Sequence, residues 1–294
     1  MWPFHRRPAR EQPSSSSRGA SALIPWLEHS GQPLPPTAQA LGPDSDAPGL
    51  LAAGGDLTTA RLTEAYTHGV FPWYGPGQPV LWWAPDPRMV LPVAEFRLSR
   101  SMRKTVQRFI ASADGEVRID GAFRRVVEAC GAAPRPGQDG TWIVPEMVDA
   151  YTAWHRAGRA HSVETWLGGE LAGGLYGVSF GRMFFGESMF AQRTDASKIA
   201  LVALMCFCRA NGIGLVDCQQ NTAHLASFGA REVPREAFEG ELRARTQLPD
   251  VTDWTYHSAY WAQLAAMRSD GAAAAVGGPG GPPPAAPGGK ESGP

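Results

Sequence analysis

The sequence contains few cysteines, and they are not arranged for metal binding or for a disulfide framework. The 294-residue chain has four, Cys130, Cys206, Cys208 and Cys218, with no CxxC pair among them. No histidines accompany them at the spacing that zinc ligands need. We therefore expect neither a metal site nor a cofactor, and we interpret all four cysteines as reduced, mostly packing residues.

The chain also lacks a long apolar run and an excess of charge of either sign. No stretch is long enough to span a bilayer, and the opening residues MWPFHRRPAR lack the continuous apolar segment of a secretion signal. We therefore expect a cytoplasmic protein with no membrane partner. The chain has 27 basic and 28 acidic residues, so any nucleic-acid site must be a local patch.

A conventional covalent nucleophile is missing as well. Ser188 lies in GESMF and not in a GxSxG turn, and no histidine follows at a position typical of a catalytic pair. A mechanism through a covalent serine or cysteine intermediate is therefore disfavoured. Direct transfer between two bound substrates agrees better with these residues.

What the sequence does contain is enough apolar residue, 43%, to bury a substantial core. Its two ends are different, because residues 1–22 are rich in Arg, Pro and Ser, and residues 271–294 are almost wholly Ala, Gly and Pro. Such segments bury too little apolar surface to offset their ordering entropy, so we predict disordered tails there. A glycine-rich loop from Gly131 to Gly140 predicts a domain boundary or an insertion.

Periodicity and turn residues predict an α+β fold. Helices are expected over 60–67, from Ser99 to Ala111, after a cap at Asp120, over 145–156, and from Asp195 or Ser197 to Ala210. Strands are expected over 80–84, 162–167, 170–179, 183–189 and 215–218. The three middle strands are joined by tight turns with glycine, so they predict an antiparallel meander.

Three polar residues in the C-terminal half are candidates for catalysis. Alternation along a strand places Asp217 and Gln219 on one face, and a mixed sheet would bring Glu187 beside them. Such a trio can hold an attacking amine, orient its lone pair and take up a proton, as acyl transfer to nitrogen requires. The alternative is a polar network that only satisfies the strand ends.

Three further groups of residues each have a structural and a functional interpretation. The apolar side chains near the trio either form plain core or line a pocket for an uncharged side chain: Leu175, Phe184, Met189, Leu204 and Val216. The tryptophans of the proline-rich segment, Trp73 among them, either pack in a loop-rich core or form a binding platform. The basic side chains of one helical face are either solvated or bind phosphate: Arg100, Arg103, Lys104 and Arg108.

The chain resembles the leucyl/phenylalanyl-tRNA–protein transferases. Between Gly49 and Leu242 it carries in order GLLAAGGDL, AYTHGVFPWY, LWWAPDPR, TWIVPEM, AHSVETW, GGLYGV, FFGESMF, ASK, and DCQ followed by HLASFGA. Each motif alone is weak, but the ordered set is very specific. Only the two tails and the loop from Cys130 to Gly140 are not matched.

The resemblance implies an enzyme of the bacterial N-degron pathway. Such an enzyme transfers leucine or phenylalanine, and less readily methionine, from charged tRNA to the α-amine of proteins that begin with Arg or Lys. The implied architecture is a small N-terminal α+β domain over 23–135 and a catalytic domain over 136–270 with a GCN5-related N-acyltransferase fold. A monomer is also implied.

Matched position by position, the resemblance places Glu187, Asp217 and Gln219 on the family's functional polar residues. It places Trp73 and Trp142 on residues associated with the 3′-terminal adenosine of tRNA. The five apolar residues above fall on the pocket for the donor side chain.

Two other functions compete with this one. An acyl-CoA N-acyltransferase needs a glycine-containing loop before the helix to hold pyrophosphate, and the corresponding stretch here is AQRTDASK, which has no glycine. A non-catalytic tRNA-binding protein would use the basic helical face and lose affinity steeply with salt. That function leaves the polar trio unexplained.

Overall fold

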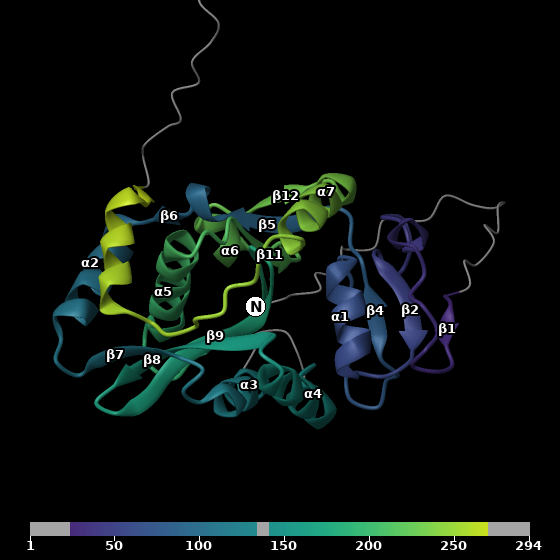
Figure 1. Ribbon diagram of the computed structural model, residues 1–294, viewed down its shortest axis with the longest axis horizontal. Helices are drawn as coiled ribbons and strands as arrows, with labels where there is room; N and C mark the ends of the chain where they lie inside the picture. The colour runs from purple at the N-terminus through teal and green to yellow at the C-terminus, as the bar shows by residue number, and fades with distance from the viewer. Residues whose placement is uncertain (1–23, 134–140, 270–294) are drawn as a thin grey trace, which may run out of the picture.

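A computed structural model describes residues 24–133 and 141–269. Its strands form two main sheets, which lie side by side along the long axis of the molecule (Figure 1). The predicted tails, and all but the first three residues of the predicted loop from Gly131 to Gly140, lie outside the described residues. No helix of the described part is long and apolar enough to cross a bilayer.

The smaller sheet has the strand order β1-β2-β4-β3 and carries α1 (Thr59–Thr67) beside it (Figure 1). Its strands are β1 (Trp26–Leu27), β2 (Leu50–Gly54), β3 (Phe71–Pro72) and β4 (Leu81–Trp83). The predicted helix over 60–67 is confirmed. Thr58 caps it, because its hydroxyl accepts the N–H of Arg61.

The larger sheet has seven strands in the order β12-β5-β11-β10-β9-β8-β7. These are β5 (Arg88–Pro92), β7 (Gly115–Ile119), β8 (Ala160–Leu167), β9 (Glu170–Phe180), β10 (Met183–Ala191), β11 (Leu215–Gln219) and β12 (Arg231–Val233). The antiparallel meander β8-β9-β10 is confirmed. Strand β11 joins β10 in parallel, so the sheet is mixed, which is the arrangement that brings Glu187 beside Gln219.

Helices cover both faces of the larger sheet. On one face lies α5 (Ala196–Ala210), which is apolar on nearly every side and correspondingly buried (Figure 1). On the other lie α3 (Phe123–Ala132) and α4 (Pro145–Arg156). Helix, meander, helix and parallel strand follow one another in the order that the resemblance implies, and the α+β class is confirmed.

The remaining elements surround these layers. They are η1 (Thr37–Gln39), η2 (Val93–Glu95), β6 (Arg97–Leu98), α2 (Arg100–Ala111), α6 (Ala223–Ser227), α7 (Arg235–Thr246), η3 (Ser258–Ala266) and β13 (Arg268–Ser269). The predicted helix at Ser99 is confirmed, because the Ser99 hydroxyl accepts the N–H of Met102.

The predicted cap at Asp120 is wrong. Asp120 has a left-handed backbone with φ of 61°, and its carboxylate accepts hydrogen bonds from His161 and from the N–H of Ser162. The helix begins only at Phe123, and the N–H of the preceding Ala122 donates to Glu164. The carboxylate of a distant strand thus replaces the local cap.

The sequence did not predict β5, β7 or β12. Because β5 and β7 belong to the seven-stranded sheet, the chain passes from one sheet to the other between Trp83 and Arg88. The boundary expected near residue 135 falls instead inside the larger sheet, between β7 and β8.

Candidate active site

Glu187 is the centre of a buried hydrogen-bond network. Its side chain lies on β10, and the residue is 2% exposed. Oxygen Oε1 accepts hydrogen bonds from the Tyr66 hydroxyl at 2.6 Å and from Nε2 of Gln219 at 3.0 Å, and Oε2 accepts one from the Tyr151 hydroxyl at 3.2 Å. The donors come from α1, α4 and β11, so three separate parts of the chain converge on one carboxylate.

Burial changes the acidity of this network. It raises the pKa of Glu187 to about 7, although hydrogen bonds from Tyr66 and Tyr151 oppose the change. Burial and the carboxylate also raise the pKa of both tyrosines well above the usual value, so each stays a neutral donor. A carboxyl group with a pKa near 7 can exchange a proton at neutral pH, as a general base must.

Asp217 is held in a buried ion pair. Arg88 of β5 donates to it twice, from Nε to Oδ1 at 2.9 Å and from Nη2 to Oδ2 at 2.6 Å. The N–H of Gln219 also donates to Oδ1, at 2.8 Å. The guanidinium lies over the rings of Phe71 and Phe238, at 4.8 and 4.6 Å from their centroids. The carboxylate is therefore neutralised by arginine and fixes the backbone of Gln219.

The strand is irregular between these two polar residues. Asp217 pairs with Val90 and Gln219 pairs with Met89, so Cys218 is an extra residue in a β-bulge. The backbone of Gln219 is left-handed, with φ of 63°. Strict alternation, on which the sequence prediction relied, is therefore wrong here. The bulge and the left-handed backbone, and not alternation, determine how the amide reaches Glu187.

An apolar cavity adjoins Glu187. Its volume is about 70 Å³, and its wall includes all five apolar residues predicted to line a pocket: Leu175, Phe184, Met189, Leu204 and Val216. Ser188, Thr222 and His224 also contribute to the wall. The cavity is therefore predominantly apolar, with the carboxylate of Glu187 in its wall.

Trp73 and Trp142 lie together on the other side of the amide. Both line a narrow cleft with Gln219, and the other wall residues are Phe71, Pro72 and Gln220. Trp73 also meets Trp83 edge to face at 5.4 Å, so it belongs to the tryptophan cluster as well as to the cleft. The two tryptophans named by the resemblance thus come from segments about 70 residues apart and meet at Gln219.

The basic face of α2 does not join this site. Arg100, Lys104 and Arg108 are exposed on the helix. Arg103 behaves differently, because its guanidinium donates to the backbone oxygens of Leu264 and Met267. It therefore tethers the C-terminal segment, and three of the four predicted cations remain at the surface.

Sequence reasoning missed three residues of the site, which are Arg88, Tyr66 and Tyr151. Arg88 is the last residue of the LWWAPDPR motif, and Tyr66 is the second residue of AYTHGVFPWY. Membership in these two motifs was therefore a signal for both residues. Tyr151 is the fourth residue after the TWIVPEM motif and carries no such signal.

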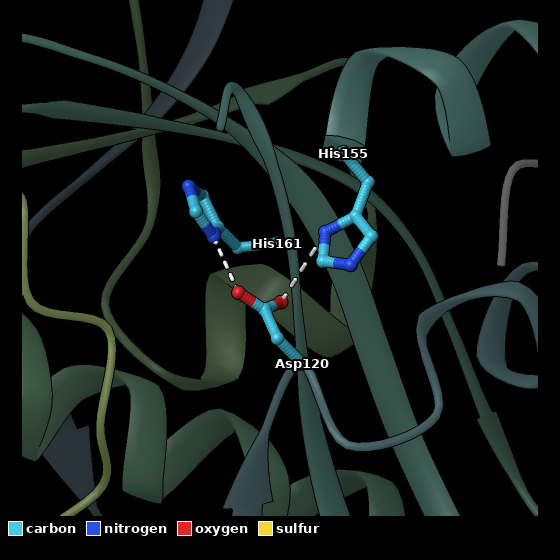
Figure 2. A group of neighbouring side chains, drawn as sticks. All are labelled: Asp120, His155 and His161. Atoms are coloured by element: carbon cyan, nitrogen blue, oxygen red, sulfur yellow. Dashed lines mark hydrogen bonds and ion pairs between the residues drawn. The ribbon is translucent and has the colours of Figure 1, made fainter. Parts of the chain in front are cut away.

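One further group has the composition of a metal site. Side-chain atoms of Asp120, His155 and His161 lie within 4.8 Å of one another (Figure 2). However, Nδ1 of His161 already donates to Asp120 at 2.7 Å, and Nδ1 of His155 donates to the backbone oxygen of Ala160 at 2.8 Å. The two Nδ1 atoms and the carboxylate are thus engaged in hydrogen bonds, whereas Nε2 of His161 is buried with no partner among the described residues.

Comparisons with known proteins agree with the geometry. A family model described as leucyl/phenylalanyl-tRNA protein transferase matches residues 90–243, and the model of its N-terminal domain matches residues 55–86. The gap between the matches falls where the chain leaves the smaller sheet for the larger one.

Several bacterial proteins named leucyl/phenylalanyl-tRNA–protein transferase are similar over most of the chain. One from Methylibium petroleiphilum is 62% identical over 239 residues, which are 81% of this chain and 90% of that protein. One from Leptothrix cholodnii is 62% identical over 244 residues, 82% of this chain and 95% of that protein. One from Burkholderia vietnamiensis is 54% identical over 242 residues, 82% and 94%.

Proposed function

The chain belongs to the leucyl/phenylalanyl-tRNA–protein transferase family and is an aminoacyltransferase. We propose that it transfers leucine, phenylalanine or, less readily, methionine from charged tRNA to the N-terminal Arg or Lys of proteins. The observation that carries this proposal is the contact between Glu187 and Gln219. This buried pair lies between an apolar cavity and a tryptophan-lined cleft, where a donor side chain and its adenosine can lie on either side of one ester bond.

Gln219 orients the attacking amine in this proposal. Its Nε2 donates to Glu187, so the amide oxygen, Oε1, is not the atom that contacts this carboxylate. No partner for that oxygen is recorded in the described part of the chain, and Gln219 lines the cleft. The oxygen accepts a hydrogen bond from the α-amine and aligns its lone pair with the ester carbonyl.

Glu187 supplies charge and takes up a proton. The acceptor arrives as an α-ammonium with a cationic first side chain, and an ionised carboxylate attracts both. The ammonium gives one proton to Glu187, and the neutral amine then attacks the carbonyl carbon. The ester C–O bond breaks, and the leaving ribose oxygen takes a proton from the nitrogen.

Asp217 has a positioning role in this scheme. Both of its oxygens accept hydrogen bonds from Arg88, so the carboxylate is engaged inside the protein and is not assigned the role of base. It holds the N–H of Gln219 instead, and thereby the left-handed backbone that presents the amide.

The direct test is transfer of labelled leucine from leucyl-tRNA to a peptide that begins with Arg. We expect label in the peptide, attached to its α-amine, and none in the matched peptide whose α-amine is acetylated. Label that remains on tRNA with purified, folded protein would contradict the proposed function.

We also propose that the exposed cations of α2 bind the phosphates of tRNA. The triple variant Arg100→Ala, Lys104→Ala and Arg108→Ala is expected to raise KM for leucyl-tRNA about tenfold or more at moderate salt, because three phosphate contacts are lost. The slope of log KM against log salt should fall by about two to three.

Arg103 stays in place in that variant, because its two hydrogen bonds tether the C-terminal segment. A matched control replaces exposed arginines of other helices, Arg124 and Arg243, by alanine. If both variants change KM equally, α2 has no special role in binding tRNA.

A further inference from the structure

A second and larger hollow lies between the four-stranded sheet and the start of α4. It is an open groove of about 920 Å³, with walls from β1, from the end of β2, from the turn at residues 75–79 and from residues 143–146. Its volume is more than ten times that of the apolar cavity beside Glu187, so several residues of a polypeptide can lie in it.

The groove is acidic. Glu28, Asp56 and Glu146 line it, and the lining contains no lysine, arginine or histidine. Among residues 24–133 and 141–269, no ion pair is recorded for any of these three carboxylates. Their charge is therefore available to a cationic ligand, and it repels the phosphates of RNA.

Tyr74 is an independent sign of a polar ligand. It lines the groove and is 8% exposed, and in the described chain no hydrogen-bond partner is recorded for its hydroxyl. Burial and the charge of Glu146 raise its pKa to about 12, so the hydroxyl keeps its proton. A neutral hydroxyl that is not itself buried and has no protein partner among the described residues is suited to a peptide N–H or carbonyl group.

The opposite wall offers an aromatic surface. Trp26 of β1 is 57% exposed, and its ring lies against Gly54 of the neighbouring strand. An exposed indole face attracts the alkyl stem or the cationic end of lysine and arginine side chains. Acidic and aromatic groups together favour a basic polypeptide over an acidic one.

The groove adjoins the proposed reaction centre. Trp73 and Trp142 line the cleft that contains Gln219, and the residues that follow them in the chain, Tyr74 and Ile143, line the groove. The same two segments therefore border both spaces. The basic helix α2 lies at the other end of the molecule from β1 (Figure 1), which separates the RNA-binding surface from the acidic groove.

From this arrangement we infer that the groove binds the acceptor polypeptide downstream of its first residue and selects acceptors with lysine or arginine there. The inference rests on the proposed function, because it needs an acceptor whose α-amine is at Gln219. It adds a second level of selectivity, beyond the identity of the N-terminal residue.

The test compares three acceptors, which are Arg-Ala amide, an octapeptide that begins Arg-Ala and continues with lysines and alanines, and the same octapeptide with glutamates in place of lysines. The variant Glu28→Gln/Glu146→Gln removes two charges at the groove. Glu170→Gln/Glu232→Gln, at exposed positions on β9 and β12, is the matched control. Leucyl-tRNA is the donor throughout, and unfolding midpoints check that the variants are folded.

The wild-type protein is expected to show a KM for the lysine octapeptide at least about fivefold below that for the glutamate octapeptide. The groove variant should reduce this ratio about fivefold, and the control variant should leave it unchanged. Transfer to Arg-Ala amide should be the same in all three proteins, because the dipeptide does not reach the groove.

Three results would overturn the inference. The first is equal KM values for the two octapeptides with wild-type protein. The second is a ratio of these KM values that stays the same in the groove variant. The third is a groove variant that changes KM for leucyl-tRNA instead, which would mark the groove as an RNA contact. Failure of the wild-type protein to modify even Arg-Ala amide would overturn the proposed function itself.

Discussion

Replacing Glu187 with glutamine is expected to lower kcat/KM for an Arg-initiated peptide about 100-fold to 1,000-fold. Glutamine keeps the shape of the side chain and one of the two oxygens that accept from Tyr66 and Tyr151, and its NH2 can donate to the hydroxyl oxygen at the other position, so the network loses mainly its negative charge and its proton acceptor. Transfer rates with saturating leucyl-tRNA would measure the effect. The control is Glu170→Gln, at an exposed position on the neighbouring strand.

The pH dependence of the transfer rate is a second test with the same variant. Because the pKa of Glu187 is about 7 and the ionised form is the active one, the wild-type rate should rise through pH 7 to a plateau. The glutamine variant should lose this inflection. A variant with wild-type kcat/KM and the wild-type pH profile would exclude Glu187 from the reaction.

The stability of the Glu187→Gln variant should rise at alkaline pH, although its activity falls. Folding raises the pKa of Glu187 above its ordinary value of 4.5, so the folded state favours the protonated carboxyl. Its contribution to stability is complete below pH 4.5 and is lost as pH rises through about 7. At pH 8 we therefore expect Glu187→Gln to be more stable than wild type by about 1–3 kcal/mol. Lost activity would then not result from unfolding.

Replacing Arg88 with methionine is expected to have the largest effect on stability. Methionine keeps much of the stem but leaves the carboxylate of Asp217 buried without its counter-ion. Loss of one partner from a buried ion pair typically costs about 3–5 kcal/mol. Unfolding in urea, followed by circular dichroism, would measure the change in free energy.

The double variant Arg88→Met/Asp217→Asn separates the ion pair from the shape of the site. Removal of both charges is expected to recover a large part of the lost stability, because no unpaired charge stays buried. Arg231→Met on the adjacent β12 is the control, since its ion pair with Glu95 is exposed and should change stability by about 0.5 kcal/mol or less. A cost below about 1 kcal/mol for Arg88→Met would contradict the structural role of the pair.

Some elements were predicted because their signals are local. The helix over 145–156 has proline at its first position and Gly158, with φ of 75°, just after its end. The meander was indicated by apolar runs separated by turns with glycine, and such turns permit few alternatives to a hairpin. No strand was predicted at β5, a segment of five residues that follows Pro87 and ends with Pro92, because proline within or beside a short run weakens the signal for a strand.

The sequence by itself determined the α+β class, the apolar helix between two polar strand segments, and the ordered motifs of the family. Only the tertiary structure decided how the polar residues work. Arg88 and Asp217 are 129 residues apart in sequence, and Tyr66 and Glu187 are 121 apart. Hydropathy patterns report whether a position is buried, because burial follows the local period of a helix or strand. They do not report which distant group satisfies a buried carboxylate, because that depends on strand order, on register and on the irregularities at Glu187 and Cys218.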